Sequence, residues 1–149
     1  MNGQLSTYFT WREAVFSETA ARLGIDNTPP AHIQENIRAA AVRLDRVREL
    51  LAVPMIVSSW YRCPPVNRAV GSSSTSDHLT GWAIDFAAPR YGSPRQVFAY
   101  LKPLMRDLLI DQLILEYPDL PTGGWVHISL RPGPRFAALL IDHNGTVAA

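Results

Sequence analysis

Two histidines and an aspartate have the residue types and the placement that a metal site needs. His78 precedes Asp85 with the turn-forming Gly81 between them, and His127 lies in a stretch of alternating apolar residues. This alternation predicts a strand whose His127 side chain faces away from the core. Two imidazoles and one carboxylate leave the fourth position of a zinc ion for water, as in catalytic sites, where zinc brings the pKa of that water near neutrality. The spacing alone is also typical of ordinary hydrogen-bonded residues.

The first half of the chain is predicted to be helical. Thr10–Glu13 has the spacing of a capping box and Gly24 is a natural helix end, so one helix is expected over about Trp11–Leu23. Pro29 and Pro30 open a longer helix. Its apolar residues recur at steps of three and four, which predicts one buried stripe of Ile33, Ile37, Ala40, Leu44, Val47 and Leu51.

The second half is predicted to supply a sheet. Ser93–Gln96 is a second capping box, and the helix that it begins is expected to continue through Leu101 to Leu108 with a bend at Pro103. Strand patterns cover Met55–Val57, Trp82–Phe86, Gln112–Tyr117, Trp125–Leu130 and Ala137–Asp142. Helices first and strands later predict an α+β fold, with a helical N-terminal half packed on a mainly antiparallel sheet. No linker divides the chain, so residues 1–149 are expected to form a single domain.

Composition excludes several classes of protein. Fourteen basic and thirteen acidic residues give a formal net charge of +1, and no local basic cluster indicates nucleic-acid binding. No apolar run is long enough for membrane insertion, and Met1–Leu5 does not begin a signal-peptide pattern. The lone Cys63 excludes an internal disulfide and a cysteine-rich zinc site.

The residues around the candidate ligands resemble a known family. Ser76-x-His78-x-x-Gly81-x-Ala83-x-Asp85, followed by Trp125-Val126-His127, is similar to the zinc site of the D-alanyl-D-alanine zinc metallopeptidases, which share a fold with the Hedgehog signalling domain. The likeness covers nearly the whole chain and is closest to short versions encoded by phages and prophages. Further matching segments are Tyr8–Thr10, Gly24–Asn27, Ser58–Arg62 and Pro65–Asn67. The resemblance implies a Hedgehog/D-Ala-D-Ala peptidase-like fold in which His78, Asp85 and His127 bind Zn2+.

The resemblance also implies roles for residues beside the metal. Arg62 matches the family's arginine that binds the substrate's carboxylate or steadies the carbonyl oxygen as charge develops. Ser76 is a second candidate for the carboxylate, although a serine in this run is equally typical of a turn. Trp60 stands where relatives often carry glycine, and a tryptophan there is expected to narrow the pocket.

The family pattern does not assign the general base directly. Relatives with a Glu-x-x-His pattern place the base three residues before the last ligand, where this chain has Gly124. Glu116 is the expected replacement, because it ends a predicted strand on the face opposite Leu113 and Leu115. Asp119, on the loop just beyond, is the alternative.

The implied function is hydrolysis of D-alanine-containing peptide bonds in the stem peptides of bacterial peptidoglycan. Carboxypeptidase and endopeptidase activity stay equally open, because both use the same groups. The protein is expected to be a monomer, made in the cytoplasm and brought to the cell wall by phage delivery or holin-dependent release. Two alternatives are a non-catalytic zinc or peptidoglycan-binding module and a structural component of a phage tail.

Overall fold

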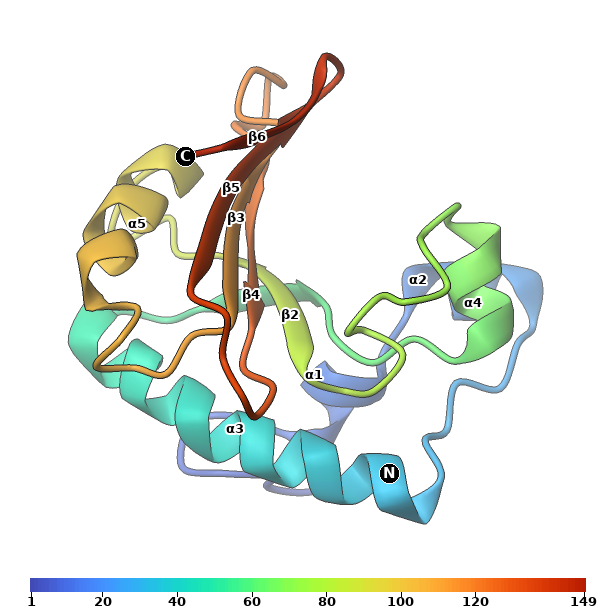
Figure 1. Cartoon of the computed structure of the whole chain (residues 1–149). Coiled ribbons are helices and arrows are strands. Elements are labelled where there is room, and N and C mark those ends of the chain that lie inside the picture. The colour runs from blue at the N-terminus through green and yellow to red at the C-terminus, as the bar shows by residue number, and fades with distance from the viewer.

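A six-stranded mixed sheet forms the centre of the computed structural model, which describes residues 1–149 (Figure 1). In spatial order the strands are β1 (Ile56–Ser59), β2 (Ala83–Ala87), β4 (Trp125–Ser129), β3 (Gln112–Glu116), β5 (Ala137–Asp142) and β6 (Gly145–Ala148). All neighbouring pairs are antiparallel except β3 and β5, which are parallel. The α+β prediction is confirmed, and the parallel pair makes the mainly antiparallel sheet a mixed one.

Helices surround this sheet. They are α1 (Trp11–Val15), α2 (Glu18–Leu23), α3 (Ala31–Leu51), α4 (Pro64–Ala69) and α5 (Pro94–Leu101). The long α3 runs beneath the sheet and α5 lies alongside it, whereas α2 and α4 stand together across a gap from the strands (Figure 1). Every residue of the predicted α3 stripe is buried, so this helix supplies the floor of the core. No helix here has both the length and the apolar character that crossing a membrane would require.

Several boundaries differ from the sequence prediction. The single helix expected over Trp11–Leu23 is wrong, because Ser17 adopts an extended conformation and its side chain accepts a hydrogen bond from Ala20 N, which starts α2 afresh. The helix α5 ends at Leu101, and Pro103 follows inside a short 3-10 turn that does not continue to Leu108. The helix α4 and the last strand β6 were not predicted.

The central strands position two of the candidate metal ligands, Asp85 and His127. Strand β4 lies between β2 and β3, and its His127 is directly opposite Asp85 of β2 on one side and Ile114 of β3 on the other. The turn before β2 is held against α3 at Gly81, where an added Cβ would lie 2.6 Å from a side-chain carbon of Ile37. A glycine with φ of +80° is needed for this close approach. The fold thus fixes the turn that carries His78 relative to the sheet.

Candidate metal centre

The structure brings His78, Asp85 and His127 together at the centre of the sheet. Asp85 Oδ1 lies 2.9 Å from His127 Nδ1, and Asp85 Oδ2 lies 3.2 Å from His78 Nε2. The candidate ligand atoms of the three residues are within 4.8 Å of one another, and all three side chains are buried. Each residue therefore offers one atom to a common point, as a small metal ion requires.

A backbone carbonyl fixes the orientation of His78. Its Nδ1 lies 2.6 Å from Trp60 O, and its backbone N–H donates to Ser76 Oγ at 3.2 Å. The Trp60 indole is fully buried, and its Nε1 donates to Gly81 O at 2.8 Å. The expectation that Trp60 narrows the pocket is therefore wrong: its side chain belongs to the core, and its carbonyl aims an imidazole at the site.

His78 Nε2 and the Asp85 carboxylate interact more favourably with a cation between them than with each other. A carbonyl can only accept, so His78 Nδ1 carries the proton and Nε2 of the neutral ring presents a lone pair. Nε2 is buried without a hydrogen-bond partner, although the carboxylate of Asp85 is close. A lone pair facing a carboxylate in a buried site is unfavourable unless a cation lies between them. The residues present fit a zinc ion, whose preferred ligands are imidazole and carboxylate.

Burial and charge set the protonation of the three side chains. Burial lowers the pKa of His78 and keeps its ring neutral. Burial also lowers the pKa of His127, but the hydrogen bond to Asp85 and the charges of Asp85 and Glu116 outweigh it, so the pKa is raised. For Asp85, burial acts to raise the pKa, and the two neighbouring imidazoles outweigh burial and hold it far below its ordinary value. The carboxylate thus stays ionised between the histidines.

Arg62 and Glu116 each lie beside one of the candidate ligands, Arg62 near Asp85 and Glu116 near His127. Arg62 Nη2 is 3.3 Å from Asp85 Oδ2, and its Nε donates to Ser59 Oγ at 3.1 Å, so the guanidinium is held in place. Glu116 Oε1 is 3.9 Å from His127 Nδ1, at the end of β3. Burial raises the pKa of Glu116, and the negative charge of Asp85 raises it further. Asp119 is exposed in the following turn and makes no contact with the ligands.

The backbone explains why position 124 is a glycine here. An added Cβ at Gly124 would lie 2.0 Å from Glu116 O and 2.5 Å from Tyr117 O, and φ at Gly124 is +73°. A side chain would collide with the backbone at the very strand end that carries Glu116. A glutamate at this position could not be built on the backbone of this chain. The carboxylate near the ligands therefore comes from β3 rather than from the segment that leads into β4.

Ser76 has a structural role in the turn before His78. Its hydroxyl accepts the His78 N–H, and its side chain is half-buried at the wall of a cavity that His127 also lines. The turn interpretation is therefore correct, while its contact with a substrate carboxylate stays a prediction.

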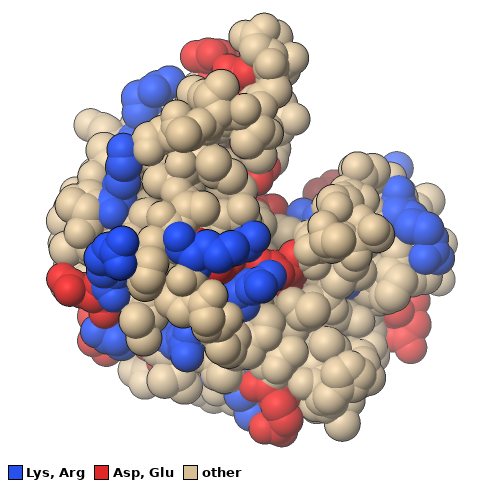
Figure 2. Space-filling view, in the orientation of Figure 1, with Lys and Arg blue, Asp and Glu red and all other residues tan.

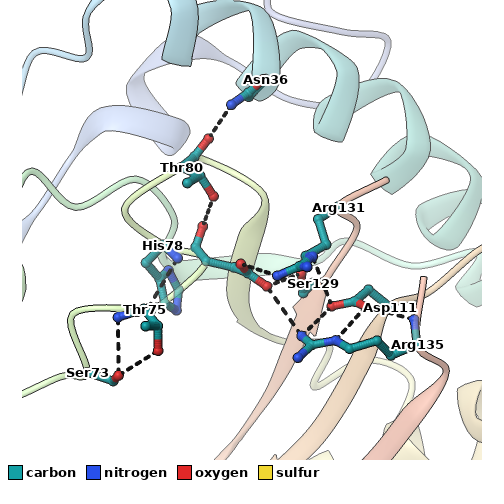
Figure 3. Close-up of polar contacts among 11 residues, drawn as sticks. Asn36, Ser73, Thr75, His78, Thr80, Asp111, Ser129, Arg131 and Arg135 are labelled. Carbon is teal, nitrogen blue, oxygen red and sulfur yellow. Dashed lines mark hydrogen bonds and ion pairs between the residues drawn. The ribbon is translucent and has the colours of Figure 1, made fainter. Parts of the chain in front are cut away.

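A network of charged residues beside the site was missed by the sequence interpretation (Figure 3). Arg135 donates from N, Nε and Nη2 to the two carboxylate oxygens of Asp111 at 2.7 to 2.9 Å. Asp77 Oδ2 accepts from Ser129 Oγ at 2.8 Å, and Arg131 Nη1 lies 3.5 Å from Asp77 Oδ1. The only sequence signal was two arginines flanking Pro-Gly-Pro at 132–134, which has no characteristic metal-site spacing.

Comparison with known proteins points to one family. The family model described as Peptidase M15 matches residues 7–110, more than half of the chain. The matched segment contains Arg62, His78 and Asp85, and it ends before the strands that carry Glu116 and His127. No curated protein matches this chain.

Proposed function

This chain belongs to the peptidase M15 family of zinc-dependent peptidases, and from that premise we propose that it hydrolyses D-alanine-containing peptide bonds of bacterial peptidoglycan. The observation that carries the proposal is the convergence of His78 Nε2, Asp85 and His127 Nδ1, with the half-buried carboxylate of Glu116 beside them. Family membership supports the metallopeptidase class. The choice of a D-alanine bond in the stem peptide rests on the sequence resemblance around Ser76–Asp85.

His78, Asp85 and His127 would hold the zinc ion, which supplies a Lewis acid that polarises the scissile carbonyl and activates water. Glu116, whose Oε1 lies 3.9 Å from His127 Nδ1, would accept the proton of the attacking water and deliver it to the leaving nitrogen. Its raised pKa suits this role, because a carboxyl that holds a proton more readily can both take it and pass it on. Arg62, held by Ser59 and Asp85, presents a permanent charge to the substrate's carboxylate or to the developing oxyanion.

Digestion of purified peptidoglycan tests the proposal. We expect the zinc-loaded protein to release products whose masses in liquid chromatography–mass spectrometry correspond to cleavage after or between D-alanine residues. Loss of a single terminal D-alanine would identify a carboxypeptidase, and separation of cross-linked stems would identify an endopeptidase. His127→Ala protein is the control. Binding of peptidoglycan with no new products would favour the non-catalytic binding module instead.

A further inference from the structure

A polar cavity of about 360 Å3 adjoins the metal centre. It is lined by His127 on one side, by hydroxyl-bearing residues of 72–76 on another, and by Arg131 and Arg135 from the loop after β4. Arg62 and Glu116 are not among its lining residues. Figure 2 shows this face hollowed between the sheet and the α4 segment, with basic and acidic side chains side by side at the inner end of the hollow. Of the residues that line this cavity, Arg131 and Arg135 have no part in the proposed hydrolysis.

The loop that carries the two arginines is fixed in shape. Arg131 and Arg135 flank Pro-Gly-Pro at 132–134, where the prolines restrict the backbone and Gly133 has φ of +68°. Asp111 is fully buried, and Arg135 donates three hydrogen bonds to its carboxylate (Figure 3). Arg135 is thus an anchor for the loop, and it presents Arg131 to the cavity without the entropy cost of ordering a free loop.

Arg131 is the arginine whose donors are available. Its nearest acidic contacts are Asp77 Oδ1 at 3.5 Å and Asp111 Oδ2 at 4.0 Å, and neither is a hydrogen bond. Asp77 is already bonded to Ser129 and Asp111 to Arg135. The Arg131 side chain is 42% exposed at the cavity wall. Two aspartates form ion pairs with this guanidinium, but none of its N–H groups donates a hydrogen bond, so they can still donate to a ligand.

We propose that Arg131 binds a carboxylate of the substrate in this cavity and so sets specificity for anionic stem peptides. The inference rests on the proposed peptidase function, because a peptide seated here would continue directly to His127. The two positive charges of Arg131 and Arg135 are balanced by the two negative charges of Asp77 and Asp111, so the cavity opposes a doubly charged phosphate more strongly than a singly charged carboxylate. The hydroxyls across the cavity supply further donors to the same carboxylate.

Amidation of single carboxylates tests the assignment. The probes are the pentapeptide L-Ala-γ-D-Glu-L-Lys-D-Ala-D-Ala and two versions amidated at either the D-Glu α-carboxylate or the C-terminus. Dissociation constants are measured by calorimetry on the zinc-loaded Glu116→Gln protein, which is expected to bind without cutting. The same titrations are made after adding Arg131→Gln or Arg131→Lys. Arg38→Gln is the matched control, because Arg38 is also half-exposed and paired with an acid, but lies on α3 outside the cavity.

We expect one amidation to weaken binding about ten- to a hundredfold in the parent and in Arg38→Gln, and to have little effect in Arg131→Gln. Arg131→Lys should retain only part of the discrimination, since lysine lacks the planar fork. The amidation whose effect disappears in Arg131→Gln identifies the carboxylate that Arg131 binds. Equal sensitivity to both amidations with and without Arg131, at unchanged melting temperature, would overturn the inference and leave the peptidase proposal intact. Failure of every pentapeptide to bind the parent would overturn the inference, whereas the absence of new products in the peptidoglycan digestion would overturn the peptidase proposal.

Discussion

At the scale of single residues, the metal centre depends on His78 Nε2, a buried nitrogen that has no hydrogen-bond partner. His78 Nε2 and the Asp85 carboxylate face each other because Trp60 O holds the opposite side of the imidazole. The same carbonyl prevents the ring from turning its proton toward Asp85. The site is therefore prepared for zinc by a backbone group that no side-chain substitution removes.

Removal of a ligand should abolish zinc binding and the stability that comes with it. We expect wild-type protein to contain about one zinc per chain and to melt at higher temperature with added zinc, because a ligand that binds only the folded state stabilises it. His78→Ala and His127→Ala should lose both properties. Zinc content by plasma mass spectrometry and melting curves with and without zinc measure them. Full occupancy in either variant would show that the ligand assignment is wrong.

Substitution of Glu116 should separate metal binding from proton transfer. Glu116→Gln keeps the shape of the side chain, so zinc content and melting temperature are expected to be nearly unchanged. The rate of peptide hydrolysis should fall about a hundredfold to ten-thousandfold, the usual contribution of a general base. Asp119→Asn is the control and should lose little, because Asp119 is exposed and away from the ligands. The reverse pattern of rates would move the role to Asp119.

The sequence predicted these residues unequally, for a physical reason. His78, Asp85 and His127 occur in short motifs whose local geometry is repeated across a family, so their convergence could be expected from spacing and resemblance. The bond between Asp111 and Arg135 joins the start of β3 to the loop before β5, and only the assembled sheet brings them together. The burial of Trp60 likewise depends on packing against Phe9, far away in sequence.

At the scale of the elements, the close approach of the backbone at Gly124 to the end of β3 determines which segment can supply the general base. The β3 strand ends at Glu116, and the segment entering β4 passes so close that only glycine fits. The capping boxes at Thr10 and Ser93 and the long helix α3 were predictable, because their signals are local. The break before Ser17 and the helix α4 were not, since tertiary contacts decide whether short helices continue or form.

Alanine at Gly124 should damage the fold far more than alanine at its neighbour. Gly123 also has positive φ, +80°, but its added Cβ would meet only Pro94 at 3.4 Å, an ordinary contact. Both substitutions cost about 1 kcal/mol of backbone strain. Gly124→Ala adds a collision with two carbonyl oxygens, so its loss of unfolding free energy should exceed that of Gly123→Ala by about 1–3 kcal/mol. Urea denaturation of the two variants measures the difference. Equal losses of unfolding free energy would contradict the close backbone approach at Gly124.

At the scale of the whole molecule, the buried Asp111 holds the loop between β4 and β5 through its hydrogen bonds with Arg135. Burial raises its pKa, but the hydrogen bonds and charge of Arg135 outweigh burial and hold the pKa below its usual 3.8. A carboxyl with a lowered pKa contributes stability above its unfolded value and loses that contribution as the pH falls through the folded value. The link between Asp111 and the loop of Arg131 should therefore weaken in acid.

Comparison with Asp111→Asn isolates this acid sensitivity from that of other carboxylates. At pH 7 the substitution should lower the unfolding free energy by about 1–3 kcal/mol, because it removes a buried, charge-assisted pair. Below pH 3.8 the carboxyl takes up a proton first in the unfolded chain and only at lower pH in the folded protein, so the difference between the two proteins should shrink as the pH falls. Denaturation at a series of pH values measures it. A difference that stays constant down to pH 2 would show that the pair contributes nothing through its charge.

The position of β4 between β2 and β3 has a consequence for protein synthesis. A ribosome makes β4 after both of its neighbours, so a nascent chain that stops at β3 has a gap in the middle of its sheet. Such a chain still lacks His127, the residue that pairs with Asp85 across β2 and β4. The three candidate ligands come together only when the last central strand has been inserted. In the cell, metal capture would thus mark the moment at which translation has passed β4 and the sheet has closed.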